Sequence, residues 1–462
     1  MQQDKRLYAL EHEKTGKLLF RYALPAVVGT MVNSLYNIVD RIFIGQFAGD
    51  DVLAGLAITF PIIMFAQAFG MLVGAGASVR ISILLGRKEF DMAERVLGNA
   101  IVLTFFFNAM VAAIGYTFMD PLLRMFGATD GIISYAKQYL TIALGFNIFL
   151  DLTFSYNAII RTTGYPTKAM ITMLIGAILN IILDPIFIGV FRWGIAGAAW
   201  ASNISLLAST SFVMSHFFSK KSVIHFSRRG FKLSLQTMKQ IVSIGIAPWA
   251  MMIVGSVVNI VINRSFNAFG QSDIETNSAI AAFGIILSIS QLFIQFMVGV
   301  SLGGQPIIGF NYGAGHVSRS ISTYKAVVSV NVAMACIGFI IANFFPSLVV
   351  GLFNPGADLA KITNTAIGIT FLCFPVVGVQ VSTTQFFQAL GKSSKAMFIS
   401  LTRQALYLLP LLLILPRIGE LGLKGVWMAM PIADFLAGTT AIIMVLNFIP
   451  KFRRQNPERP IE

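Results

Sequence analysis

Charged residues are scarce in this chain of 462 residues. They make up 12% of the sequence, whereas hydrophobic residues make up 56%. Soluble domains carry roughly a quarter charged residues, because much of a globule's surface must face water. So low a charge excludes a soluble globular protein and favours a chain that crosses a membrane many times.

Cysteine and histidine are also rare, which limits the chemistry available. The two cysteines, Cys336 and Cys373, lie in apolar stretches, where we expect them to pack as small residues. The four histidines lack the spacing of metal ligands. One fragment of a phosphate-binding loop, Gly391-Lys392-Ser393, has Phe386 where the first glycine should stand. The sequence therefore predicts neither an enzyme nor a bound cofactor.

Long uncharged stretches are abundant. Residues 52–79 and 326–357 contain no Asp, Glu, Lys or Arg, and each exceeds the roughly 20 residues that a helix needs to cross the hydrocarbon. Runs of this length indicate helices and not barrel strands. With an occasional charge allowed, we predict twelve membrane helices, at residues 17–45, 52–79, 96–119, 133–159, 168–191, 193–218, 241–268, 277–312, 326–352, 362–390, 396–416 and 423–449.

The two halves of the chain resemble each other. Offsets of 223 to 229 residues place Asp40 on Asn263, and Gly70, Gly74 and Gly86 on Gly299, Gly303 and Gly315. Each repeat has six helices, an even number, so both repeats have the same orientation in the membrane. We predict an all-α membrane protein with twelve transmembrane helices in two parallel six-helix repeats. Its parts are an N-terminal lobe (1–218), a cytoplasmic linker (219–240) and a C-terminal lobe with a tail (241–462).

The cations fall mostly on one side of the predicted membrane. Of the 34 Lys and Arg, 26 lie in the two tails and in the loops on the same side, which predicts cytoplasmic termini. This distribution explains the net charge of +14 through contact with anionic lipid, so no nucleic-acid partner is expected. The first 17 residues are charged and lack the apolar core of a signal peptide, so we expect the first helix to be retained.

Of the twenty acidic residues, four lie well inside predicted helices: Asp40, Asp151, Asp184 and Asp434. A carboxylate in hydrocarbon is costly unless it is neutralised, paired or hydrated, so each of the four is a candidate functional group. Asp151 and Asp434 lie outside any clear polar stripe. For these two, a structural hydrogen bond and a role facing the substrate are equally open.

The first helix carries a polar stripe. Asn33, Asn37 and Asp40 recur at i, i+4 and i+7, so they share one face, which we expect to point inward. In the fifth helix, Asn180 and Asp184 are i, i+4 neighbours that offer an amide and a carboxylate to one cation or proton. We expect Asp40 and Asp184 to act as one coupled site, with Na⁺ as a possible transient ligand.

The second repeat substitutes amides for acids. Ser256, Asn259 and Asn263 form the polar stripe of the seventh helix, and amides do not titrate near neutral pH. We therefore expect ion coupling in the first half and uncharged contacts in the second. The candidates for the substrate cavity are Asn33, Asn37, Asp151, Asn259, Asn263, Gln305 and Asp434. Adaptable methionine and aromatic surfaces there would suit large organic cations.

Five motifs carry a family resemblance: Leu24-Pro25, residues 37–40, residues 180–185, residues 197–202 and residues 305–315. With them, the chain resembles the multidrug and toxic compound extrusion (MATE) family along nearly its whole length. The pattern is similar to the MepA-like and DinF-like bacterial exporters. The resemblance implies two six-helix lobes around a V-shaped cleft, alternating access, and export driven by inward H⁺ or Na⁺.

The resemblance also implies roles for single residues. Asp40, Asn180 and Asp184 match the cation site of the family's N-terminal lobe, and Ser202 lies near a contributing hydroxyl. Pro25 matches a proline at which the first helix bends. The seventh and tenth helices contain no acid, so the C-terminal sodium site of another branch of the family is not expected here.

Together these observations predict a secondary active multidrug exporter of the bacterial cytoplasmic membrane. It would exchange H⁺ or Na⁺ for small, amphipathic, organic cations, and would work as a monomer surrounded by membrane lipid. A lipid-linked saccharide flippase of the same superfamily is the alternative, although such flippases more usually have fourteen helices and several cations inside the membrane. A channel is a further alternative that would need no titrating pair.

Overall fold

The computed structural model describes residues 2–48, 50–227, 230–270, 272–353, 356–419 and 421–459. Within these ranges, the side chains of residues 2–5, 37–42, 44–48, 50–54 and 273–274 are not described. Helices account for nearly all of the described chain, and this part contains no strand. The predicted all-α membrane fold is confirmed.

The first lobe contains α2 to α8, and α1 lies before it. The bounds are α1 (Gln2–His12), α2 (Thr15–Ala48), α3 (Asp50–Gly86), α4 (Phe90–Thr117), α5 (Met119–Met125), α6 (Ile133–Thr162), α7 (Pro166–Asp184), the π-helix η1 (Pro185–Val190) and α8 (Gly194–Phe218). Pro185 has no N–H group and cannot complete the regular hydrogen-bond ladder, so α7 continues as a wider π-helix.

The second lobe contains α9 to α17. The bounds are α9 (Leu235–Phe269), α10 (Asp273–Ala314), α11 (Val317–Phe344), α12 (Pro346–Gly351), α13 (Ala357–Thr370), α14 (Phe374–Ala389), α15 (Ser393–Leu401), the π-helix η2 (Thr402–Leu408), α16 (Leu409–Ile414), the 3₁₀ helix η3 (Leu415–Arg417) and α17 (Gly422–Gln455). Because α9 begins at Leu235, the segment between the lobes is shorter than the linker predicted from the sequence.

The predicted spans correspond to observed helices, with one break. In the described part of the chain, ten helices are long and apolar enough to cross a membrane. The bent pair α13 and α14 forms an eleventh span, with an angle of 55° where one continuous helix was predicted. Helix α8, at the predicted span 193–218, packs against α6 and α7 but is not among these apolar spans. Polar residues such as Asn203 and His216 lower the hydropathy of α8, and both are buried.

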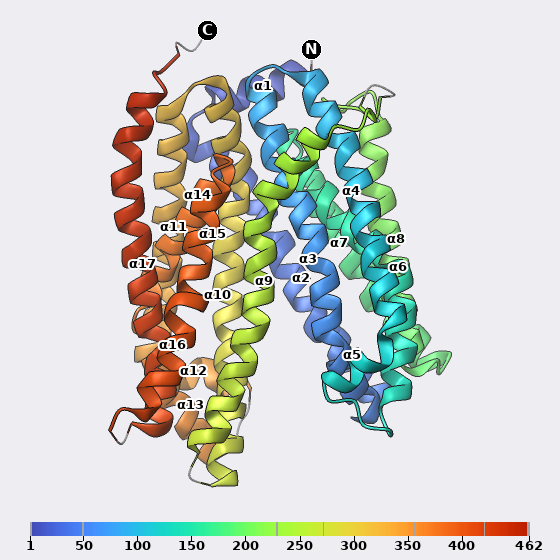
Figure 1. The fold of residues 1–462 in the computed structure, drawn as a ribbon, viewed down its shortest axis with the longest axis vertical. Helices are drawn as coiled ribbons and strands as arrows, with labels where there is room; N and C mark the ends of the chain where they lie inside the picture. The colour runs from blue at the N-terminus through green and yellow to red at the C-terminus, as the bar shows by residue number, and fades with distance from the viewer. Residues whose placement is uncertain are drawn as a thin grey trace.

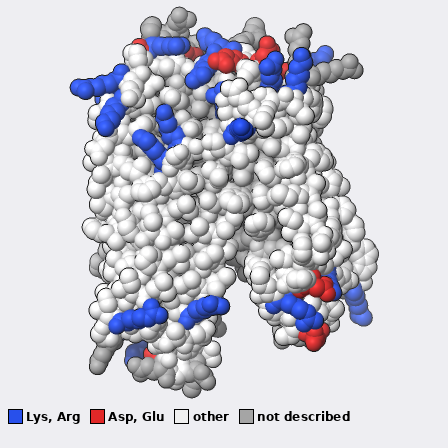
Figure 2. Space-filling model, in the orientation of Figure 1, with Lys and Arg blue, Asp and Glu red and all other residues white. Residues whose placement is uncertain are grey.

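The two lobes stand side by side and join at one end (Figure 1). Both termini lie at this joined end, which we call the terminal face. The space-filling view shows a hollow between the lobes at the opposite end, so the cleft opens away from the termini (Figure 2). Lysines and arginines gather on the terminal face in this view, and few lie at the tips of the lobes.

Close backbone contacts hold the lobes together near the terminal face. Helix α3 packs against α9, and α2 packs against α10. A Cβ atom at Gly76 of α3 would collide with the carbonyl oxygen of Ile241, and one at Gly245 of α9 would collide with the carbonyl oxygen of Leu72. This reciprocal pair shows that the contact needs glycine on both sides. A buried apolar cluster also spans the seam, from Leu72 of α3 to Ile307 of α10.

Candidate cation site and inter-lobe cleft

Two neighbouring helices of the first lobe bring three predicted site residues together. Nδ2 of Asn180, on α7, donates to Oδ1 of Asp184 at 3.2 Å and lies 3.3 Å from Oγ of Ser202 on α8. Asn180 is 2% exposed and Asp184 is fully buried. The first contact follows from the i, i+4 spacing, whereas the second depends on the packing of α7 against α8.

The donor atoms of this cluster fit a small hard cation or a proton. Carboxylate, amide and hydroxyl oxygens are the ligands that hard cations prefer, and a carboxylate also accepts a proton. Oδ1 of Asn180 is buried and accepts no hydrogen bond within the described part of the chain. A buried acceptor without a donor is costly, and a cation bound beside Asp184 would satisfy it.

Helix α2 passes next to this cluster. It packs against α7 and against η1, the π-helix that follows Asp184. The side chains of Asn37 and Asp40, which α2 carries, lie outside the described residues, so the predicted pairing of Asp40 with Asp184 stays a prediction. Asn33, one turn before Asn37, is half-buried, and Pro25 lies within the continuous helix α2.

Asp151 lies where α6 meets α4 and α3. Nδ2 of Asn147, on the same helix, donates to Oδ2 of Asp151 at 3.1 Å, and Nδ2 of Asn108 on α4 lies 3.4 Å from the same atom. Asp151 is 1% exposed. Its Oδ1 is buried and has no hydrogen-bond partner within the described part of the chain, so both roles left open by the sequence stay predictions.

Asp434 forms an ion pair that the sequence did not reveal. Its Oδ1 on α17 accepts a hydrogen bond from Nε of Arg403 on η2. Asp434 is 3% exposed, whereas the side chain of Arg403 keeps 27% of its surface exposed. Arg403 is one of the 26 cations assigned above to the cytoplasmic side, although it lies within the predicted span 396–416. An arginine eight residues into a predicted span was the signal that a buried acid pairs with it.

The predicted amides of the second repeat differ in exposure. Asn259 and Asn263 are exposed on α9, and Nδ2 of Asn259 donates back to the carbonyl oxygen of Gly255 in the same helix at 3.0 Å. Gln305 of α10 is buried, and its Nε2 has no hydrogen-bond partner within the described part of the chain. Their role in a substrate cavity stays a prediction.

A two-lobed bundle of membrane-spanning helices, with a cleft between the lobes and polar groups buried within them, is the architecture of a membrane transporter. The model of the MatE family matches residues 25–186 and 251–414, so the chain belongs to the MatE family. The resemblance inferred from the motifs is confirmed. Members of this family are transporters and not enzymes, which confirms the prediction that no enzymatic activity is present.

Similar proteins match the chain over nearly its whole length. Multidrug export protein MepA of Staphylococcus aureus is 27% identical over 443 residues, which are 96% of this chain and 96% of the relative. MepA of Staphylococcus haemolyticus is 26% identical over 444 residues, with the same coverage. A solved outward-facing structure of a multidrug resistance MATE family transporter has a TM-score of 0.90 at 23% identity and covers 97% of this chain and 98% of that one. This last likeness shows the fold.

Proposed function

We propose that the protein exports small organic compounds across the bacterial cytoplasmic membrane in exchange for H⁺ or Na⁺. The multidrug export proteins to which the chain is similar support the export of varied organic compounds. The buried cluster of Asn180, Asp184 and Ser202 is the observation that supports coupling of export to H⁺ or Na⁺. A buried carboxylate beside an unsatisfied amide oxygen is a place where a proton or a small cation gains a favourable environment.

The cation distribution supports an orientation for this transport. Lysine and arginine gather on the terminal face (Figure 2), and cytoplasmic surfaces of membrane proteins carry this excess. With the terminal face in the cytoplasm, the cleft faces outward. This conformation is the one from which an exporter releases its substrate.

A coupling mechanism follows from the position of α2. Because α2 contacts α7 and η1, a cation bound at Asp184 changes the electrostatic environment of the helix that carries Asp40. Pro25 cannot donate the backbone hydrogen bond of a regular helix, so α2 can bend there at low cost. Cation binding and the shape of the cleft are then linked, and reciprocity requires that substrate binding changes cation affinity as well.

We also propose that the substrates are cationic and that the protein works as a monomer. Two acids at one site can hold one proton or Na⁺ and release it when an organic cation binds, which favours cationic substrates. One chain contains both lobes and the cleft between them, so a monomer suffices for transport. The coupling ion is the only cofactor that the proposal requires.

Substrate efflux from reconstituted vesicles tests the proposal. A pH gradient and a Na⁺ gradient are imposed separately, and uphill transport of a fluorescent organic cation is measured. We expect one of the two gradients to drive transport in the wild type, and Asp184→Asn to lose it. Asp130→Asn is the matched control, because Asp130 has a largely exposed side chain in a surface ion pair with Arg124.

Other outcomes would contradict the proposal. Flux of the organic cation down its own gradient, with no response to either counter-gradient, would indicate a channel. Movement of a lipid-linked saccharide, with no uphill transport of organic cations, would indicate the flippase.

A further inference from the structure

A basic pocket of about 750 Å³ lies at the seam between the lobes on the terminal face. Its walls come from the end of α3, the first turns of α9, the end of α10 and the turn between α14 and α15. Four cations line it: Arg80, Arg87, Lys239 and Lys392. Among the residues that the structure describes, none of those lining the pocket is acidic.

The protein compensates the cations of the pocket only in part, because Glu89 interacts electrostatically with Arg80 but forms no ion pair with it. Among the described residues, none of the four forms an ion pair with an acid, and the buried Nε of Arg80 donates no hydrogen bond. Like charges gathered in one pocket create a strongly positive potential that attracts anions. Gln240, Ser243 and Tyr312 add neutral donors around the same space. This set of groups matches the oxygen atoms of a phosphate.

Apolar side chains border the pocket on the side of the linker. Leu235, in its wall, is 69% exposed, and Leu233 just before it is 67% exposed. Exposed leucines beside a cluster of cations are the pattern of a surface that contacts both the acyl chains and the headgroups of anionic lipid. They favour a lipid as the source of the phosphate.

We propose that this pocket binds a phosphate group, supplied by an anionic lipid headgroup or by a free phosphate compound, and that the bound phosphate holds the two lobes together at the terminal face. Arg80 and Arg87 belong to the first lobe, and Lys239 and Lys392 belong to the second. The four charges converge when the lobes are closed here. A phosphate therefore binds this conformation more tightly than one with separated lobes, and shifts the population towards it.

A binding titration tests the first part of the proposal. The purified full-length protein in neutral detergent is titrated with short-chain phosphatidylglycerol, short-chain phosphatidylcholine or inorganic phosphate, and the midpoint of thermal unfolding is followed. We expect phosphatidylglycerol to raise the midpoint and phosphatidylcholine to leave it unchanged. Arg87→Gln with Lys239→Gln should weaken the apparent affinity roughly 25-fold, at about 5-fold for each cation removed near the headgroup.

The matched control is Arg453→Gln with Arg454→Gln, which removes the same charge from exposed positions at the end of α17 and leaves the pocket lining intact. This control should keep the wild-type affinity. A rise with inorganic phosphate as large as that with phosphatidylglycerol would assign the site to free phosphate compounds. No rise with either compound, or equal losses in the two double variants, would overturn the proposal.

A distance measurement tests the second part. Asp91 at the start of α4 and Ser322 in the first turns of α11 are exposed and belong to different lobes. Spin labels at Asp91→Cys and Ser322→Cys, in a protein whose two native cysteines are replaced by alanine, therefore report the separation of the lobes in lipid nanodiscs. Adding phosphatidylglycerol to phosphatidylcholine should increase the population with the shorter distance, and the Arg87→Gln, Lys239→Gln variant should lose this response. An unchanged distance distribution in the wild type would contradict the bridging role. Neither experiment requires transport, so their outcomes are independent of the proposed export activity.

Discussion

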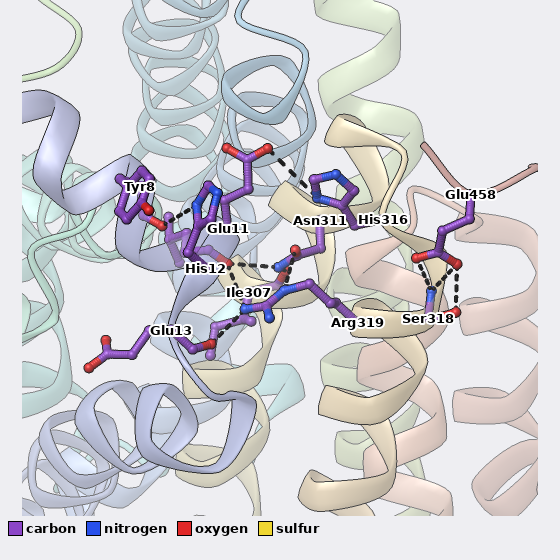
Figure 3. Close-up of polar contacts among 11 residues, drawn as sticks. Tyr8, Glu11, His12, Glu13, Ile307, Asn311, His316, Ser318, Arg319 and Glu458 are labelled. Atoms are coloured by element: carbon purple, nitrogen blue, oxygen red, sulfur yellow. Dashed lines mark hydrogen bonds and ion pairs between the residues drawn. The ribbon is translucent and has the colours of Figure 1, made fainter. Parts of the chain in front are cut away.

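The guanidinium group of Arg319 donates a hydrogen bond to the carbonyl oxygen of Glu13 at 2.7 Å (Figure 3). Arg319 belongs to α11 of the second lobe, and Glu13 directly follows α1. Nε of Arg319 also donates to Oδ1 of Asn311, whose Nδ2 donates to the carbonyl oxygen of Leu10 at 3.1 Å. The end of α1 is thereby fixed to the second lobe.

The middle of α1 is fixed to the first lobe through Arg6. Nη1 of Arg6 donates to the carbonyl oxygen of Gly164 at 2.9 Å, and the guanidinium lies 3.7 Å from the centre of the Tyr165 ring. The helix therefore links both lobes at the terminal face, beside the glycine contacts of α3 and α9. It stabilises the conformation in which this end is closed.

We predict that Arg319→Gln weakens this link. Hydrogen bonds from a charged group contribute about 2 kcal/mol, so the thermal unfolding midpoint should fall and labels on the terminal face should separate. Arg454→Gln is the control, because Arg454 is an exposed arginine at the end of α17. Equal behaviour of the two variants would show that α1 does not hold the lobes.

Gly245→Ala should oppose closure at the seam itself. The new Cβ would collide with the backbone of Leu72, which cannot rotate away, and overpacking of this kind costs about 2 kcal/mol. Gly284→Ala is the control, because a Cβ there meets no atom within 4 Å, and alanine favours a helix over glycine. Spin-label distances across the terminal face should lengthen in Gly245→Ala alone. A wild-type distance distribution in that variant would show that the contact of Gly245 with Leu72 does not hold the terminal face closed.

The asymmetry of the repeats predicts different effects at equivalent positions. Asp40→Asn removes a titratable group and should abolish uphill export, whereas Asn263→Ala removes amide contacts and should mainly weaken substrate handling. Efflux from vesicles with an imposed ion gradient measures both. Normal uphill export by well-folded Asp40→Asn protein would exclude Asp40 from coupling.

Substrate binding should depend on pH or Na⁺ through Asp184. Two nearby carboxylates in a medium of low polarity resist simultaneous ionisation, so acid or Na⁺ loads the site and should lower affinity for a cationic substrate. Asp184→Asn should flatten this dependence while the protein stays folded. Titrations of substrate binding against pH, with and without Na⁺, provide the measurement. An unchanged dependence in Asp40→Asn and Asp184→Asn would place coupling elsewhere.

The ion pair of Arg403 and Asp434 should be structural. Asp434→Asn leaves a largely buried arginine without its counter-charge, which costs about 3 kcal/mol. Arg403→Leu with Asp434→Leu removes both charges and should recover most of the lost stability, as measured by thermal unfolding. Ion-driven export should survive in the double variant. Its loss in a stable double variant would assign the pair to transport.

Much of the molecule follows from local patterns in the sequence. The long apolar runs determined the membrane helices, because a span must bury about 20 residues whatever its neighbours are. The i, i+4 spacing determined the contact of Asn180 with Asp184, since helix geometry fixes it. The cation count predicted the charged terminal face seen in Figure 2.

Other features arise only from tertiary packing. The 55° break between α13 and α14 directly precedes Pro375, whereas α2 continues through Pro25, so a proline alone does not decide where a span breaks. Arg403 and Asp434 are 31 residues apart, Arg319 and Glu13 are 306 apart, and the basic pocket draws on four separate segments. Periodicity tells which face of a helix is polar but not which helix that face meets. The partner is decided by the packing of twelve helices against one another, where close glycine contacts and the burial of unlike charges select one arrangement.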